Sequence, residues 1–233
     1  MQVFEGQNEV ASFDAHAGAA CALALHPSGS ILASVGVDKS YALYDLDTFK
    51  LVTQVYTNSG TCDDVTHPTP FADLSFSGLT SVEFHPDGHL LAAGGQDGQI
   101  KLFDVKTSSQ MAAFDLPSAV KALDFSENGT WLAAIASSSS AVSIWDLRKM
   151  SEIKSIDVGS SKSVESIKWD YTGQFLLTGS GEGVTVQHYA KAEKKWSEPL
   201  RMAAPAVKVA WGKDGHGVIS LDGKGVVSVF STS

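Results

Sequence analysis

The sequence predicts an all-β fold of the β-propeller type, and three observations lead to this prediction. A glycine-centred unit recurs at Gly29, Gly88, Gly129, Gly173 and Gly215, in steps of 59, 41, 44 and 42 residues. Each unit contains short apolar runs separated by turns, and no stretch has the periodicity of a helix. A repeat just above forty residues with four short strands is typical of a propeller blade.

The first apolar run of each unit is expected to form the inner strand of its blade. These runs are nearly unbroken, as in CALAL at 21–25 and VKVAW at 207–211. Strands that are covered on both faces have this composition. We therefore expect burial on both sides of the inner strands, and Cys21 should be a small buried thiol.

A turn and a second apolar run follow the inner strand. The five turns read HPSG, HPDG, SENG, DYTG and GKDG. Glycine in the last place suits the positive φ that such turns require. His26 and His85 precede proline in two equivalent turns, so they are expected to be structural parts of the repeat.

The third run of each unit ends on an aromatic residue, and an outer fourth strand should follow. The expected blade aromatics are Tyr44, Phe103, Trp145 and Phe230, with Gln187 in that place in the fourth unit. An aspartate comes next in three units, at Asp45, Asp104 and Asp146.

The dipeptide Trp145-Asp146 and the turn aspartates Asp38, Asp97 and Asp222 resemble WD repeats. In that family a histidine before the first strand, a serine or threonine in the second, the turn aspartate and the third-strand aromatic form a hydrogen-bonded chain. The resemblance therefore implies a WD-repeat β-propeller whose blades are held in part by such chains.

In this sequence the resemblance implies one complete chain, formed by His16, Ser34, Asp38 and Tyr44. An unpaired buried polar group costs about 1–3 kcal/mol, which is a structural reason for these residues. The alternative is a catalytic His16–Asp38 pair, but no nucleophile accompanies it. The third unit has serines at 138–140 in place of the turn acid, and the fourth lacks both aromatic and acid. Those blades should depend more on packing.

The whole of 1–233 is interpreted as a single propeller domain, because 43% hydrophobic residues suffice for one core. The repeats span about 16–56, 78–115, 117–157, 162–202 and 205–233. Residues 1–15 are interpreted as remnant strands of a preceding blade, and 57–77 as an insert loop. We expect five recognisable blades from the C-terminal part of a seven-bladed propeller. In the alternative, a closed five-bladed ring, residues 10–13 would complete the last blade.

Charge and composition exclude several function classes. A net charge of −9 repels phosphate backbones, so direct nucleic-acid binding is not expected. No apolar run is long enough for a membrane span. Two unclustered cysteines favour a reduced intracellular compartment.

No catalytic residue, cofactor or metal site is predicted. The ionisable residues of the inner strands are expected to form a lysine–carboxylate ring around a solvated channel, without a nucleophile or a metal-ligand set beside them. The ionisable residues of the inner strands are Glu83, Asp124, Glu165, Lys121, Lys168 and Lys208.

The insert contains Cys62, Asp63, Asp64 and His67, whose spacing matches no structural zinc pattern. Long loops on rigid scaffolds commonly carry recognition. We predict a partner-contacting loop that includes Asp63, Asp64 and His67, the alternative being a disordered loop.

Two stretches resemble the propeller of the pre-mRNA-processing factor nineteen family, namely VKALDFSENGTWLA and HPDGHLLAAGGQDGQIKLFDVK. The members of that family are spliceosomal ubiquitin ligases. The resemblance covers nearly the whole chain. It implies a nuclear scaffold without cofactor, with roles in splicing, ubiquitin conjugation and DNA repair. The implied partners are splicing factors and ubiquitination substrates.

In that family a U-box performs the ligase chemistry, and a coiled coil makes the full-length protein a homo-tetramer. Neither is found in these 233 residues, so catalysis by the chain itself is not expected. The alternative is a WD-repeat adaptor of an unrelated intracellular complex.

Overall fold

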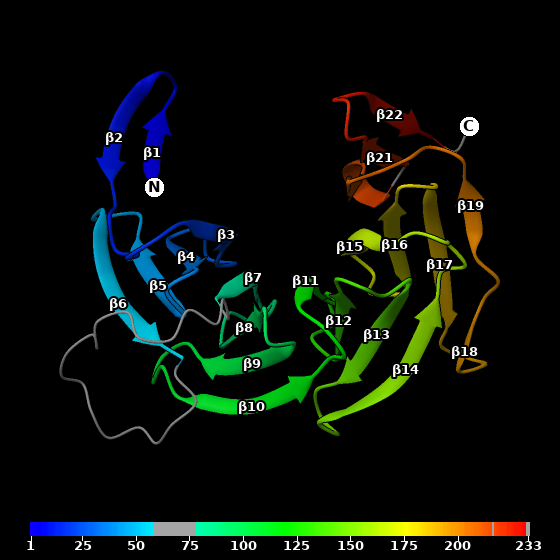
Figure 1. The fold of residues 1–233 in the computed structure, drawn as a ribbon, viewed down its shortest axis with the longest axis horizontal. Helices are drawn as coiled ribbons and strands as arrows, with labels where there is room; N and C mark the ends of the chain where they lie inside the picture. Colours follow the sequence, from blue (N-terminus) through cyan, green and yellow to red (C-terminus); the bar gives the residue numbers. More distant parts are fainter. Residues whose placement is uncertain (58–77, 216, 232–233) are drawn as a thin grey trace.

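The computed structural model describes residues 1–57, 78–215 and 217–231, and most of them lie in antiparallel sheets. Figure 1 shows the sheets fanned around a common centre, so the predicted all-β propeller with five recognisable blades is confirmed. The helical content of the described part is a single short 3-10 helix, η1 (Lys213–Gly215). No helix in that part is long and apolar enough to cross a membrane.

The first two blades are four-stranded sheets in which neighbours along the chain pair. Blade 1 consists of β3 (Ala20–Leu25), β4 (Ile31–Gly36), β5 (Ser40–Asp45) and β6 (Lys50–Tyr56). Blade 2 consists of β7 (Leu79–Phe84), β8 (Leu90–Gly95), β9 (Gln99–Asp104) and β10 (Gln110–Asp115).

Blades 3 and 4 repeat this order, with one interruption. Blade 3 consists of β11 (Val120–Phe125), β12 (Trp131–Ala136), β13 (Ala141–Asp146) and β14 (Ser151–Asp157). Blade 4 consists of β15 (Val164–Trp169), β16 (Phe175–Ser180), β17 (Val184–Ala190), β18 (Lys195–Trp196) and β19 (Leu200–Met202). Both β18 and β19 pair with β17. Pro199 lies between them and has no N–H to donate to the sheet.

The ends of the arc differ from its middle. Blade 5 has three strands, β20 (Lys208–Trp211), β21 (Val218–Leu221) and β22 (Val227–Phe230). Before blade 1, β1 (Gln2–Glu5) and β2 (Asn8–Ser12) form a separate hairpin. Because β2 pairs with β1, residues 10–13 do not complete blade 5, and the five sheets form an open arc (Figure 1). A total of seven blades stays a prediction.

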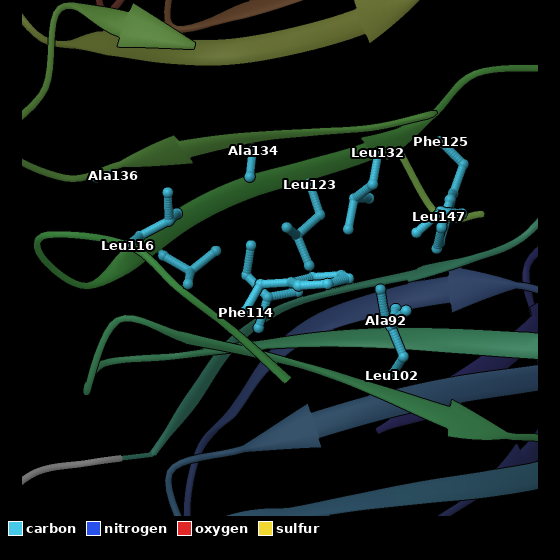
Figure 2. Close-up of a cluster of buried hydrophobic side chains, with 12 residues drawn as sticks. Ala92, Leu102, Phe114, Leu116, Leu123, Phe125, Leu132, Ala134, Ala136 and Leu147 are labelled. Atoms are coloured by element: carbon cyan, nitrogen blue, oxygen red, sulfur yellow. The ribbon is translucent and has the colours of Figure 1, made fainter. Parts of the chain in front are cut away.

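The hydrophobic core lies between neighbouring blades. Figure 2 shows the cluster between blades 2 and 3, where Leu102 of β9 packs with Phe114, Leu123 and Leu132. Similar clusters join the other neighbouring blades. Burying one such side chain stabilises the fold by about 1.5–3 kcal/mol, so each blade is stabilised mainly by contact with the next.

Blades at the ends of the arc therefore expose one apolar face. Cys21 is exposed, and Leu23 and Leu25 on the same face of β3 are 53% and 57% exposed. At the other end, Val227 and Val229 of β22 are 59% and 69% exposed. The predictions of a buried Cys21 and of two-sided burial for every inner strand are wrong here, because these blades have a neighbour on one side only.

The turns after the inner strands have the predicted backbone. All five anchoring glycines have positive φ, from 62° at Gly173 to 79° at Gly29. At Gly88 a side chain is excluded for a second reason, since a Cβ would lie 2.2 Å from Nε2 of His26.

Candidate functional site

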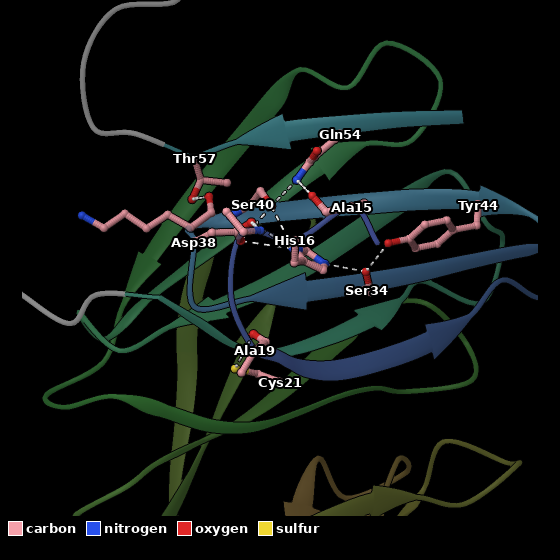
Figure 3. A network of polar contacts seen from close by, with 12 residues as sticks. Ala15, His16, Ala19, Cys21, Ser34, Asp38, Ser40, Tyr44, Gln54 and Thr57 are labelled. Atoms are coloured by element: carbon pink, nitrogen blue, oxygen red, sulfur yellow. Dashed lines mark hydrogen bonds and ion pairs between the residues drawn. The ribbon is translucent and has the colours of Figure 1, made fainter. Parts of the chain in front are cut away.

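The segment that enters blade 1 carries His16, which lies in a line of polar side chains (Figure 3). His16 Nε2 is 2.6 Å from Ser34 Oγ, and Ser34 Oγ is 3.2 Å from the Tyr44 hydroxyl. On the other side of the ring, Nδ1 is 3.1 Å from Asp38 Oδ1. The structure thus brings together all four residues that the WD-repeat resemblance selected.

Asp38 also caps the turn between β4 and β5. Its carboxylate accepts hydrogen bonds from the backbone N–H of Ala17 at 2.9 Å and from the Ser40 hydroxyl at 2.8 Å. Burial alone would raise the pKa of Asp38, but the hydrogen bonds from Ala17, Ser40 and His16 outweigh it and hold the pKa below its usual value. This one carboxylate therefore joins the entering segment to the turn.

One alternative to a structural role is catalysis, because Ser34, His16 and Asp38 are arranged in the order of a nucleophile, a base and an orienting acid. The sequence did not predict that Ser34 would take the place of a nucleophile beside the His16–Asp38 pair. Catalysis requires that a substrate reach the nucleophile. Ser34 is 0% exposed, and Tyr44, whose hydroxyl contacts Ser34, is 1% exposed. A substrate therefore cannot reach the Ser34 hydroxyl, and the arrangement is a structural network.

The predicted blade aromatics occupy equivalent places in the sheets. Tyr44, Phe103 and Trp145 pair with Leu32, Leu91 and Leu132 in the β4–β5, β8–β9 and β12–β13 registers, and Phe230 pairs with Val218. Gln187 takes this place in blade 4, opposite Leu176. Trp145 stacks on Phe114 with ring centres 4.6 Å apart.

Histidines in the turns connect neighbouring blades. His26 Nε2 donates to the Gly88 carbonyl at 3.1 Å, and His85 Nε2 donates to the Gly129 carbonyl at 2.9 Å. Each ring also packs nearly perpendicular to a phenylalanine ring, Phe84 for His26 and Phe125 for His85. These contacts agree with the structural role expected for both histidines.

The ionisable residues of the inner strands separate into two groups instead of forming one ring. Lys121 of β11 pairs with Glu165 of β15, and the hydrogen bond from Lys121 lowers the pKa of Glu165. Lys168 contacts Asp124 and lies 3.7 Å from Glu83. These residues come from three consecutive inner strands.

Asp124 is the most deeply buried of these charged groups. Burial raises its pKa to about 7, although Lys168 and the backbone N–H of Trp169 stabilise the charged form. Burial also raises the pKa of Glu83. Burial lowers the pKa of Lys168, but Asp124 and Glu83 outweigh it and the net change is upward. Lys208 has no ion pair among the described residues and is exposed.

A cavity of about 380 Å³ opens beside this group. The ends of β3, β7, β11 and β15 and the turns after them form its wall, with Glu83, Asp124, Lys168 and Tyr171 among the lining residues. The sequence predicted charged residues around a solvated channel but not which of them line this cavity, because its shape depends on how four blades meet.

The insert residues Asp63, Asp64 and His67, with Cys62, lie outside the described residues. Within the ranges that are described, no three His, Cys, Asp or Glu side chains are arranged to hold a metal ion.

Two further contacts between an entering segment and a turn were not predicted. In blade 3 the hydroxyls of Ser118 and Ser138 are 2.8 Å apart. In blade 4 the Ser161 backbone N–H donates to Glu182 at 3.0 Å. The signal in the sequence is weak, namely a polar residue shortly before the inner strand and another in the turn.

Comparison with known proteins gives matches over most of the chain. Residues 18–228 match the family described as Nucleolar protein 10-like, N-terminal domain. Pre-mRNA-processing factor 19 of Schizosaccharomyces pombe is 32% identical over 175 residues, which are 75% of this chain and 31% of that protein. The Dictyostelium discoideum protein of that name is 29% identical over 225 residues, 93% of this chain and 40% of its own length.

A more distant relative is the small ribosomal subunit protein RACK1 of Neurospora crassa. It is 29% identical over 168 residues, 68% of this chain and 47% of that protein. The chain spans less than half the length of each of these three relatives.

Proposed function

The chain belongs to the family of Nucleolar protein 10-like N-terminal domains, and we propose that it is a protein-docking scaffold of the pre-mRNA splicing machinery. The observation that carries this proposal is the similarity to several proteins named Pre-mRNA-processing factor 19, at 29–32% identity over 75–93% of the chain. The longest match covers 93% of the chain.

The geometry supports docking rather than catalysis. The blades form a set of antiparallel sheets joined by buried apolar clusters, and the Ser34 hydroxyl is inaccessible. In this proposal the partners are splicing factors and ubiquitination substrates in the nucleus. The propeller would raise their effective concentration near a catalytic domain. Ligase chemistry and tetramerisation would then reside in other parts of a longer protein.

A second candidate is an adaptor in an unrelated intracellular complex. The similarity to the small ribosomal subunit protein RACK1 favours it. Shared propeller architecture accounts for much of that similarity, since one fold can serve many functions.

Affinity purification separates the two candidates. The tagged protein would be used to capture proteins from nuclear and cytoplasmic extracts, followed by mass spectrometry, with the tag alone as control. We expect splicing factors from the nuclear extract. Recovery of small-subunit ribosomal proteins without splicing factors would favour the adaptor. Recovery of no protein complex by a soluble, folded protein would contradict both.

A further inference from the structure

We propose that the cavity at the ends of the inner strands receives an arginine side chain of a protein partner. This inference rests on the proposed docking function and specifies one place where a partner is held. It is carried by the shape of the cavity, by the unequal pairing of its charges and by its aromatic wall.

The position and size of the cavity suit a single projecting side chain. It lies where four consecutive blades meet, beside the turns that follow β3, β7, β11 and β15. Its volume of about 380 Å³ is near the lower end of the range for pockets that hold small organic groups. A flat protein surface would not fit there, but an extended side chain would.

The charges of the lining are unbalanced. Glu83, Asp124, Glu127 and Asp170 are acidic, and Lys168 is the basic residue of the lining. Asp124 is already occupied, because it contacts Lys168 and accepts the Trp169 N–H. Asp170 is occupied too, since it accepts backbone N–H groups of its own turn. Glu83 shares Lys168 with Asp124, and Glu127 is exposed, so these two carboxylates can meet a further cation.

Glu83 is the deeper of these two. Its closest cationic partner in the described structure is Lys168 Nζ at 3.7 Å, which is beyond hydrogen-bond distance. Lys168 is therefore a weaker partner for Glu83 than for Asp124, which it contacts directly. Glu127 lies exposed at the rim. An incoming guanidinium would offer Glu83 donors at hydrogen-bond distance, in a geometry that can bind a carboxylate through two parallel hydrogen bonds.

An aromatic wall favours arginine over other cations. Tyr171 is 65% exposed at the cavity, and its ring packs against Gly215 of the next turn, where a Cβ would lie 2.7 Å from Tyr171 Cε1. A planar guanidinium stacks on such a ring while its edge donates hydrogen bonds. The net charge of −9 also favours the approach of a basic segment.

NMR titration of the ¹⁵N-labelled protein tests this directly. The probes are two capped peptides, Ser-Gly-Arg-Gly-Ser and Ser-Gly-Gln-Gly-Ser, of nearly equal size. We expect saturable shifts at Glu83, Glu127 and Tyr171 with the arginine peptide, and at least tenfold weaker binding of the glutamine peptide. Equal binding of both peptides, or shifts confined to other surfaces, would overturn the proposal.

Matched variants locate the effect. Glu83→Gln should weaken binding of the arginine peptide about tenfold, as expected for loss of one charge-assisted pair. Glu165→Gln removes another inner-strand carboxylate with a lysine partner, outside the cavity lining, and should leave binding unchanged. Equal effects of the two would overturn the proposal. If Glu83→Gln unfolds the protein, the variant Glu127→Gln at the exposed rim is used instead. We expect it to weaken binding of the arginine peptide two- to threefold, and unchanged binding would contradict the proposal.

The peptide experiment is independent of the capture experiment. Splicing factors captured by a protein that does not discriminate the peptides would leave the scaffold function standing and remove this site. Peptide discrimination without captured splicing factors would keep the site and remove the proposed pathway.

Discussion

Blades 1 and 3 solve the same problem with different chemistry. In each, the segment entering the blade must be tied to the turn between the second and third strands. Blade 1 uses the His16 ring and the Asp38 carboxylate, 3.1 Å apart. Blade 3 uses the hydroxyls of Ser118 and Ser138, 2.8 Å apart. Blade 4, with Ser161 and Glu182, adds a third version.

The interiors of the two blades differ more. Ser34 connects His16 to Tyr44 in blade 1, whereas Ala134 takes the equivalent place in blade 3, two residues after the leucine opposite the aromatic. The buried indole N–H of Trp145 consequently has no acceptor among the described residues. Trp145 instead stacks on Phe114 beside a large apolar cluster. The tie between segment and turn therefore recurs, while the buried polar chain is replaceable by packing.

The largest expected effect comes from breaking the tie in blade 1. Asp38→Ala removes the partner of His16 and the acceptor for the Ala17 and Ser40 N–H groups. Hydrogen bonds to a charged group contribute about 1.5–3 kcal/mol each when lost singly, so we expect a loss near 3 kcal/mol in the free energy of unfolding. Urea denaturation followed by fluorescence measures it.

Ser138→Ala is the matched change in blade 3. It removes one hydroxyl contact between exposed residues, so the expected loss is below about 1 kcal/mol. If both variants lost the same stability, the two ties would be energetically equivalent, and the contrast drawn between the blades would be wrong.

A smaller effect is expected inside blade 1. Ser34→Ala leaves the Tyr44 hydroxyl without its contact to Ser34 and removes the partner of His16 Nε2. A buried polar group left unpaired costs about 1–3 kcal/mol, and we expect about 2 kcal/mol. Thermal unfolding of Ser34→Ala beside Ser34→Thr checks this, because threonine keeps the hydroxyl. Equal losses for both would show that shape, not the hydrogen bond, matters there.

The sequence predicted the repeated framework well, for a physical reason. Turn glycines, inner-strand composition and blade aromatics follow from local constraints repeated in every unit, and Gly88 and Tyr44 lie in the expected places. Exposure of Leu23 was not predictable, because it depends on whether a neighbouring blade is present. Nor was the pairing of Glu83, Asp124 and Lys168 into one group, since residues about forty positions apart meet only after the blades assemble.

A hydroxyl introduced into blade 3 tests whether Trp145 can use the acceptor that Ser34 provides in blade 1. Ala134→Ser puts a hydroxyl at the register position that Ser34 has in blade 1, where it can accept from the unpaired Trp145 N–H. The cost of a buried hydroxyl is then offset, and stability should change by less than about 0.5 kcal/mol. Ala93→Ser makes the same change in blade 2, where Phe103 offers no donor, and should cost about 1 kcal/mol or more. Guanidinium denaturation compares them. Identical losses would show that Trp145 gains nothing from the new hydroxyl.

The smallest expected effect is the dependence of the blade 1 tie on pH. The pKa of Asp38 is lowered in the folded protein, because hydrogen bonds from Ala17, Ser40 and His16 outweigh the effect of burial. A carboxyl with a lowered folded pKa contributes stability above its unfolded pKa, near 4, and loses that contribution as the pH falls through the folded value.

The difference in unfolding free energy between the protein and Asp38→Asn should therefore shrink as the pH is lowered from 6 to 3. The corresponding difference for Ser138→Ala should stay constant, because serine does not titrate in this range. A constant difference for Asp38→Asn would mean that the charge of Asp38 contributes nothing, and that blade 1 is tied by hydrogen-bond geometry alone, as blade 3 is.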